Sequence, residues 1–210
     1  MHRRTAVAVA LAALIATSGC LGILGGDGLS FSASQATVSE DALQETGYEE
    51  VSVNESEITR EFSAGGQSRN VTVTNWVAMY ERTVSVPVLG EQRAAVFGAF
   101  ASPEVSVVGQ SFNPIDDYSE RDLAQLAQQQ YDGLSVGQTA STREATVLNK
   151  STTVTKFEGT ADISGQSIDV YVHVTKVKHD GDYVVAVAIY PQDLDGEQER
   201  VDALLDGLDH

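Results

Sequence analysis

Two segments of the chain alternate apolar and polar side chains, which is the periodicity of a β-strand that buries one face. In the first, Val71, Val73, Val77 and Met79 alternate with Thr72, Thr74, Trp76 and Tyr80. In the second, Ile168, Val170, Val172 and Val174 alternate with Asp169, Tyr171 and His173. We therefore expect two strands, the second with a wetter face on which His173 lies at an ordinary solvated position.

Other strands are predicted by apolar runs. Residues 94–100 and 183–190 are apolar on both faces, which indicates central strands covered from both sides. Weaker strand patterns run through residues 49–61, 144–148 and 152–163.

Three segments have helical spacing: residues 39–46, 119–132 and 195–208. Ser39 and Ser119 are capping residues at the first two N-termini, and Gly47 and Gly133 end those helices. The apolar faces comprise Leu123, Leu126, Ala127 and Tyr131 in the second helix and Val201, Leu204, Leu205 and Leu208 in the third. Strands in consecutive runs with two or three packed helices predict a single α+β domain over residues 29–210, with a largely antiparallel sheet of six to eight strands.

The N-terminus has the pattern of an export signal. A basic head precedes thirteen mainly apolar residues at 5–17, which make roughly 20 Å of helix, too short to span a membrane. Residues 1–19 are therefore predicted to be a signal peptide. Arg3 and Arg4 fit a twin-arginine signal, while an ordinary basic head for general secretion explains them equally well.

Cys20 is the sole cysteine, and it follows this signal directly in a sequence that resembles a lipobox, Ile15-Ala16-Thr17-Ser18-Gly19-Cys20. A lipidated Cys20 would anchor the mature chain to the outer face of the cell membrane, with residues 20–28 as a glycine-rich tether of roughly 16 Å. The alternative is a secreted protein with a chance cysteine, but a lone exposed thiol is a liability outside the cell.

The net charge of the chain limits the classes of partner that it can bind. Thirteen basic residues include Arg3 and Arg4 of the signal, so the mature part carries eleven against thirty acids, a net charge of −19. Nucleic-acid binding depends on lysine and arginine, so this class is excluded. The acids are spread along the chain, which favours solvation in concentrated salt, and hence a halophilic source, over one cation-binding face.

Signatures of catalysis are missing from the sequence. There is no G-x-S-x-G elbow, no phosphate-binding glycine loop and no short-spaced histidine or cysteine cluster for zinc. We therefore predict neither a metal nor a cofactor nor an identifiable catalytic residue. His179 falls in a predicted hairpin turn, where solvation is the simplest expectation.

The segment 109–118, GQSFNPIDDY, is the best candidate for a ligand loop because function concentrates in irregular connections. It carries Phe112, Asn113 and Tyr118 as candidate contacts. The alternative is a loop that only plugs the edge of the core with Phe112 and Ile115.

Three N-x-S/T sequons, at Asn54, Asn70 and Asn149, are candidate glycosylation sites at predicted strand ends or turns. Asn149 is the most turn-like of them.

Several of these stretches together resemble a haloarchaeal surface lipoprotein family that is catalogued as a domain of unknown function. The resemblance rests on the lipobox, Thr46-Gly47-Tyr48, Gly66-Gln67-Ser68-Arg69 through Asn75-Trp76, Arg93-Ala94-Ala95-Val96-Phe97, Ser102-Pro103 through Phe112-Asn113-Pro114, and Tyr190-Pro191. It covers essentially the whole chain, and it implies an envelope protein without assigning an activity. The closing order of strand, proline, acids and helix is also similar to Mog1/PsbP-like sandwiches, which implies a binding or assembly module by analogy.

Two functions are therefore expected as alternatives. The first is a lipid-anchored, non-enzymatic binding or envelope-maintenance module. The second is an envelope hydrolase that uses carboxylates which the sequence cannot pair. Two buried carboxylates about 5–10 Å apart in a deep pocket would favour the enzyme, and a shallow pocket would exclude it.

Overall fold

The computed structural model describes residues 28–210 except 65–66, 87–89, 108–109, 112 and 164. Cys20, the predicted signal peptide, most of the predicted tether and Phe112 lie outside this part. None of the described helices is long and apolar enough to cross a membrane.

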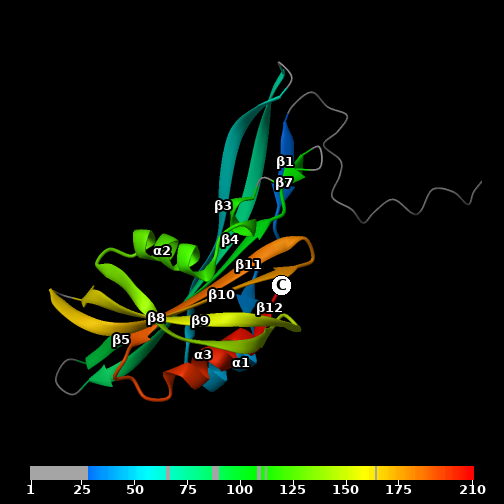
Figure 1. Cartoon of the computed structure of the whole chain (residues 1–210). Coiled ribbons are helices and arrows are strands. Elements are labelled where there is room, and N and C mark those ends of the chain that lie inside the picture. Colours follow the sequence, from blue (N-terminus) through cyan, green and yellow to red (C-terminus); the bar gives the residue numbers. More distant parts are fainter. Residues whose placement is uncertain (1–27, 65–66, 87–89, 108–109, 112, 164) are drawn as a thin grey trace, which may run out of the picture.

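The architecture is a single α+β domain built on one largely antiparallel sheet (Figure 1). Its neighbouring strands run in the order β3 (Glu49–Ala64), β4 (Gln67–Val86), β5 (Gly90–Pro103), β11 (Asp182–Pro191), β10 (Gln166–His179), β9 (Lys150–Ile163) and β8 (Leu134–Val147). Two meanders, β3–β5 and β8–β11, are thus joined by the antiparallel pairing of β5 with β11. The short strand β1 (Leu29–Ser32) pairs in parallel with β4 alongside residues 71–74.

Helices cover both faces of the sheet. Helix α2 (Glu120–Gln130) follows the 3-10 turn η1 (Pro114–Asp116) and packs on one face against β10 and β8. Helices α3 (Glu197–Asp206) and α1 (Glu40–Thr46) lie on the other face (Figure 1). Two small pairs, β2 (Thr37–Val38) with β12 (Leu208–Asp209) and β6 (Ser106–Val107) with β7 (Gln110–Ser111), complete the described elements.

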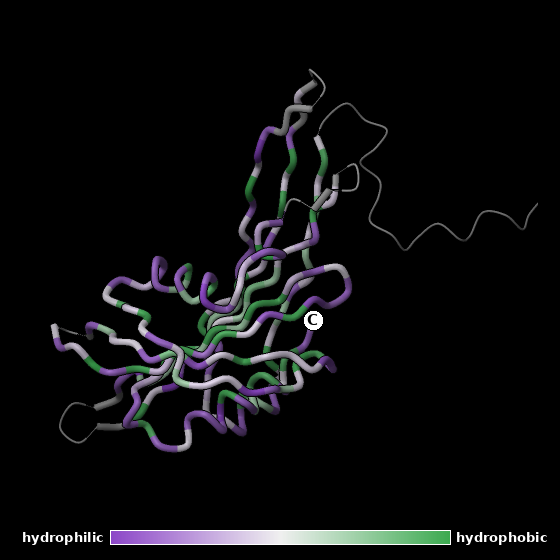
Figure 2. The backbone as a smooth tube through the Cα atoms, viewed as in Figure 1, coloured by the Kyte–Doolittle hydropathy of each residue, from purple (hydrophilic) through white to green (hydrophobic). Residues whose placement is uncertain are grey.

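Strand alternation divides the core into two layers. Along β11, Tyr183 and Val185 face the α2 side, whereas Val184, Ala186 and Ala188 face α3. The central strands are covered from both sides, as their doubly apolar sequences predict. Figure 2 shows apolar colour gathered along these strands and polar colour on the outer surfaces of the helices.

The predicted N-caps of α1 and α2 and the stop of α1 at Gly47 are confirmed. Ser39 accepts a hydrogen bond from the Ala42 amide and Gly47 adopts the left-handed conformation at φ 71°. Ser119 and Asp122 form a reciprocal capping box at the start of α2.

Helix α2, however, ends at Gln130 with Tyr131 as its C-cap, before Gly133. Helix α3 ends at Asp206, so Leu208 lies in β12 and not on the apolar face of the helix.

Two predictions of side-chain exposure are wrong. Leu126 does not belong to the buried face of α2: its side chain is 39% exposed, and Ala124 is buried beside Leu123 instead. The face of β10 that carries His173 is not solvated, because α3 closes over it and leaves His173 only 2% exposed. In both cases the exposure of the side chain depends on which other elements pack against it, and sequence periodicity does not report this.

The outer halves of β3 and β4 project from the body as a two-stranded ribbon, with β1 alongside (Figure 1). Ile58 on this part of β3 is 47% exposed. Gly28, the first described residue, lies against the backbone of Asn70 on β4. The first described residue therefore lies on the ribbon.

Candidate functional site: a polar groove beside helix α3

An open groove of about 600 Å³ lies over the ends of strands β8, β9 and β10. It is lined by Ser135, Val136, Gly137, Gln138, Glu158, Gly159, Thr160, Asp169 and Gln192. Six of these nine residues have hydroxyl, amide or carboxylate side chains, whereas most small-molecule sites are lined predominantly by apolar residues. Such a surface favours a hydrophilic ligand.

Two strand glycines allow β8 and β9 to approach closely at this groove. A Cβ atom on Gly159 would stand 2.6 Å from the carbonyl oxygen of Ser135, and one on Gly137 would stand 3.0 Å from that of Glu158. The β8–β9 register shifts just beyond Val136, so the strand bends away from regular pairing here. The glycines therefore shape the groove floor.

Helix α2 holds the irregular part of β8 in place from the other face. The guanidinium of Arg121 donates to the Gly137 carbonyl and, at 3.3 Å, to the Thr139 hydroxyl. Its Cζ atom lies 4.4 Å from the centre of the Phe157 ring, a cation–π contact. The groove is thus built on a braced strand edge and does not depend on a free loop.

A cation and an aromatic ring lie next to the groove. Tyr171 pairs with Glu158 across β10 and β9, so the two side chains share one face of the sheet. The ammonium of Lys156 lies 4.6 Å from the centre of the Tyr171 ring and donates to Gln198 on α3 at 2.9 Å. Glu158 in turn accepts a hydrogen bond from the Gln138 amide at 3.0 Å.

Beneath the first turn of α3 lies a buried ion pair. The carboxylate of Glu197 is fully buried and accepts hydrogen bonds from the Tyr48 hydroxyl at 2.8 Å and from Arg82 Nε at 3.2 Å. Burial, and then the charge of Glu197, raise the pKa of Tyr48 far above its ordinary value, so this hydroxyl remains a donor. The described contacts of Glu197 and Arg82 are all with other residues of the chain, so this ion pair anchors α3 to the strands beneath it.

His173 is part of a second internal network, together with Arg143 and Tyr190. Its Nδ1 lies 3.1 Å from an Arg143 amino group, which can only donate, so Nδ1 accepts and Nε2 carries the proton toward the Tyr190 oxygen 2.8 Å away. Burial, then Arg143 and Lys156, lower the pKa of His173 to about 3. Arg143 also pairs with Asp202 on α3.

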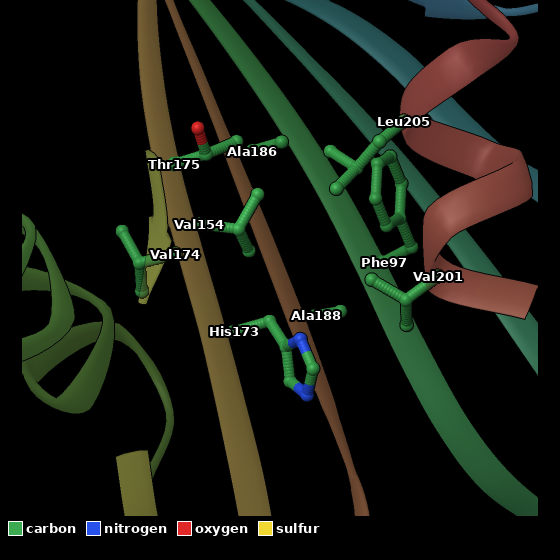
Figure 3. A pocket seen from close by; sticks show the side chains of 9 residues that line it. All are labelled: Phe97, Val154, His173, Val174, Thr175, Ala186, Ala188, Val201 and Leu205. Atoms are coloured by element: carbon green, nitrogen blue, oxygen red, sulfur yellow. The ribbon is translucent and has the colours of Figure 1, made fainter. Parts of the chain in front are cut away.

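Apart from Thr175, the side chains that Figure 3 labels around His173 are apolar, among them Phe97, Val201 and Leu205. The space that these side chains enclose leaves no room for a water molecule. A neutral histidine in a closed core, with both nitrogens engaged, is a packing and hydrogen-bonding residue.

The comparisons with known proteins bear on identity at this point. A family profile described as "Domain of unknown function (DUF6517)" matches residues 35–209. The chain belongs to the DUF6517 family. This result confirms the expectation of a family without an assigned function. Of the described domain, the match leaves out residues 28–34, which include β1, and His210.

Other comparisons add little to the DUF6517 assignment. No curated protein matches the chain. Among solved structures, a protein of unknown function from Pseudomonas aeruginosa, PA94, matches with 12% identity over 68% of this chain and 90% of that chain, at a TM-score of 0.35.

Hydrogen bonds tie the predicted ligand loop to strands β5 and β10. The Asn113 amide donates to the Ser102 hydroxyl at 2.9 Å and to the Pro103 carbonyl at 2.7 Å, and its oxygen accepts from the Ile115 amide. The carbonyl of Tyr118 accepts from the Lys176 ammonium at 2.8 Å. Asn113 is buried and Tyr118 is half-buried, so in the described residues this segment has the contacts expected of the alternative, a plug at the core edge.

All three predicted sequon asparagines are exposed. Asn149 occupies the β8–β9 turn with φ 60°, Asn54 lies on β3, and Asn70 lies on the ribbon beside Gly28. Each of these side chains is therefore accessible to a glycan.

No local sequence pattern marks the charged and amide residues of the groove. Glu158 and Asp169 stand in ordinary strand patterns, and their nearness to Gln192 follows only from the register of three strands. The available signal was glycine within a strand, at Gly137 and Gly159, which often marks a bulge or a close approach of backbones.

Proposed function

We propose that this DUF6517 protein is a lipid-anchored envelope protein of a halophilic archaeon that binds a hydrophilic ligand without transforming it. The observation that carries the proposal is the open, polar, braced groove of about 600 Å³ beside α3. Carboxylates accept hydrogen bonds, while amides and hydroxyls both donate and accept. This combination suits a ligand rich in hydroxyl groups, such as an oligosaccharide.

The geometry supports binding over hydrolysis. Hydrolysis by a carboxylate pair needs one carboxyl group kept protonated by a buried, apolar setting. Here Asp169 is exposed, Glu158 is half-buried and hydrogen-bonded to Gln138, and the groove is open to solvent. The shallow site is the arrangement expected for the non-enzymatic alternative.

The arrangement of the fold supports an outward-facing groove. The described chain begins at the ribbon, at the top of Figure 1, whereas the ends of β8, β9 and β10 that line the groove lie in the opposite part of the domain. With a short tether from a lipidated Cys20, the ribbon would lie next to the membrane and the groove would face away from it. Glycans on the exposed Asn54, Asn70 or Asn149 are compatible with this orientation, and glycopeptide mass spectrometry of native protein decides their occupancy.

Ligand binding is tested on detergent-solubilised full-length protein in concentrated salt. Saturation-transfer NMR with a panel of neutral oligosaccharides should give signals that weaken strongly in the double variant Glu158→Gln with Asp169→Asn. The matched control is Asp193→Asn, an exposed acid outside the groove, which should bind as the unmodified protein does. Absence of any binding, or binding indifferent to the double substitution, would contradict the proposed site. Turnover of a glycoside, ester or peptide that the double variant abolishes would establish the hydrolase instead.

A further inference from the structure

At the other end of the sheet from the groove, two polar side chains of the β10–β11 hairpin meet a third from the distant end of the chain. His179 ends β10, Asp182 begins β11 and His210 follows β12. The Nδ1 atoms of the two histidines are 3.1 Å apart, and His210 Nε2 lies 3.1 Å from Asp182 Oδ2. The same carboxylate oxygen accepts from the Ser34 amide at 2.8 Å, which fixes its position.

The hydrogen-bond partners determine where the protons lie when both histidines are neutral. Because a carboxylate only accepts, the proton of His210 is on Nε2, which leaves a lone pair on its Nδ1. That lone pair faces Nδ1 of His179, so the contact between the rings requires a proton on Nδ1 of His179. A single proton therefore lies between two nitrogen atoms.

We propose that a divalent transition-metal ion of the zinc type binds between these two nitrogens in place of that proton. A tetrahedral ion with bonds of 2.0–2.1 Å holds two nitrogen ligands roughly 3.3 Å apart, close to the spacing already present. On binding, the proton of His179 moves from Nδ1 to Nε2 through solvent, so both imidazoles stay neutral and no net proton is released.

The surroundings of the pair resemble those of histidine ligands. A ligating histidine usually donates its second nitrogen to a carboxylate, which orients the ring, and Asp182 takes this role for His210. The His210 side chain is 1% exposed and thus fixed, whereas that of His179 is 20% exposed and leaves an approach from solvent.

A third ligand is close by. The Asp180 carboxylate lies 3.7 Å from His179 Nδ1, and its side chain is 82% exposed and free to turn toward an ion. Within the described residues, no group of three or more histidine, cysteine, aspartate or glutamate side chains is already placed to hold a metal ion. The ion would therefore recruit Asp180 or water to complete its coordination. Lys178, which precedes His179 in the sequence, is paired with Glu104 at 2.8 Å.

The site is tested with Zn²⁺ and Co²⁺ on the full-length protein, in excess Mg²⁺ to suppress weak binding to the acidic surface. Calorimetry should show one ion per chain, and Co²⁺ should give a visible absorption band typical of nitrogen coordination. His179→Gln should weaken binding at least tenfold, and Asp182→Asn should weaken it by about 10–100-fold because it removes the partner of His210. Asp209→Asn removes a neighbouring exposed acid and should leave affinity unchanged.

Changes at the buried His210 can impair folding, so the variant His179→Gln decides the outcome, because the His179 side chain is partly exposed. Circular dichroism without metal checks that this variant is folded. The proposal is overturned if neither ion binds at millimolar concentration. It is overturned equally if a folded His179→Gln variant binds as tightly as the unmodified protein.

Discussion

Replacing Glu197 by alanine should be among the most destabilising single changes in this protein. Its carboxylate is fully buried and is the shared acceptor for Tyr48 and Arg82, whose side chain is itself only 12% exposed. Loss of Glu197 leaves a guanidinium and a hydroxyl without their partner in a desolvated site. Removing one member of a buried ion pair costs about 3–5 kcal/mol, so we expect a loss of this size in the free energy of unfolding.

The measurement is chemical and thermal unfolding in concentrated KCl, with matched variants. For a domain of this size, such a loss lowers the melting temperature by about 6–20 °C. Glu199→Ala, an exposed acid in the same turn of α3, is the control and should change stability by no more than about 0.5 kcal/mol. Tyr48→Phe removes only one of the hydrogen bonds and should cost about 1–2 kcal/mol.

A double-mutant cycle separates the pair from the packing around it. Arg82→Met combined with Glu197→Leu replaces both charges by apolar groups, and such replacements are often neutral or better. The loss in free energy of unfolding in the double variant should therefore be smaller than the sum of the losses in the two single variants by at least about 1 kcal/mol. The reasoning would be refuted by a Glu197→Ala variant within about 1 kcal/mol of the unmodified protein, or by strictly additive single changes.

Four further predictions follow from other parts of the molecule. Since burial lowers the pKa of His173 to about 3, the unfolded chain gains a proton below its ordinary pKa of 6.5 that the folded chain does not. Stability should therefore fall from pH 6.5 toward pH 3 by up to about 1.4 kcal/mol per unit, and His173→Gln should flatten this slope. Gly159→Ala should destabilise the β8–β9 pair by more than about 1 kcal/mol, because its Cβ would clash with the Ser135 carbonyl, whereas Thr160→Ala should not; unfolding in urea compares them, and equal effects would contradict the close approach. Cys20→Ser should release the protein from membranes or leave an uncleaved precursor, and a native chain whose intact mass lacks lipid would refute the anchor. Dilution from multi-molar to low KCl should lower the melting temperature as self-repulsion grows, and an unchanged midpoint would show that the acidic surface needs a specific cation instead.

The sequence by itself determined the local elements and the fold class. Caps at Ser39 and Ser119 and the stop at Gly47 act through neighbours within one helical turn, so the sequence contains all the partners involved. Strand periodicity likewise reports which face of a strand is apolar, and the doubly apolar segments at 94–100 and 183–190 are the central strands β5 and β11.

Only the tertiary structure decided which elements meet. The pairing of β5 with β11 and the closure of α3 over β10 bring together residues far apart in the chain: Arg82 reaches Glu197, and His179 reaches His210. Register also places Glu158 in the lining of the groove. The closure of α3 buries His173, whose alternating pattern alone indicated a solvated face. Periodicity distinguishes the two faces of a strand but does not report what later covers each face, and contacts across a sheet depend on pairings that no local pattern encodes.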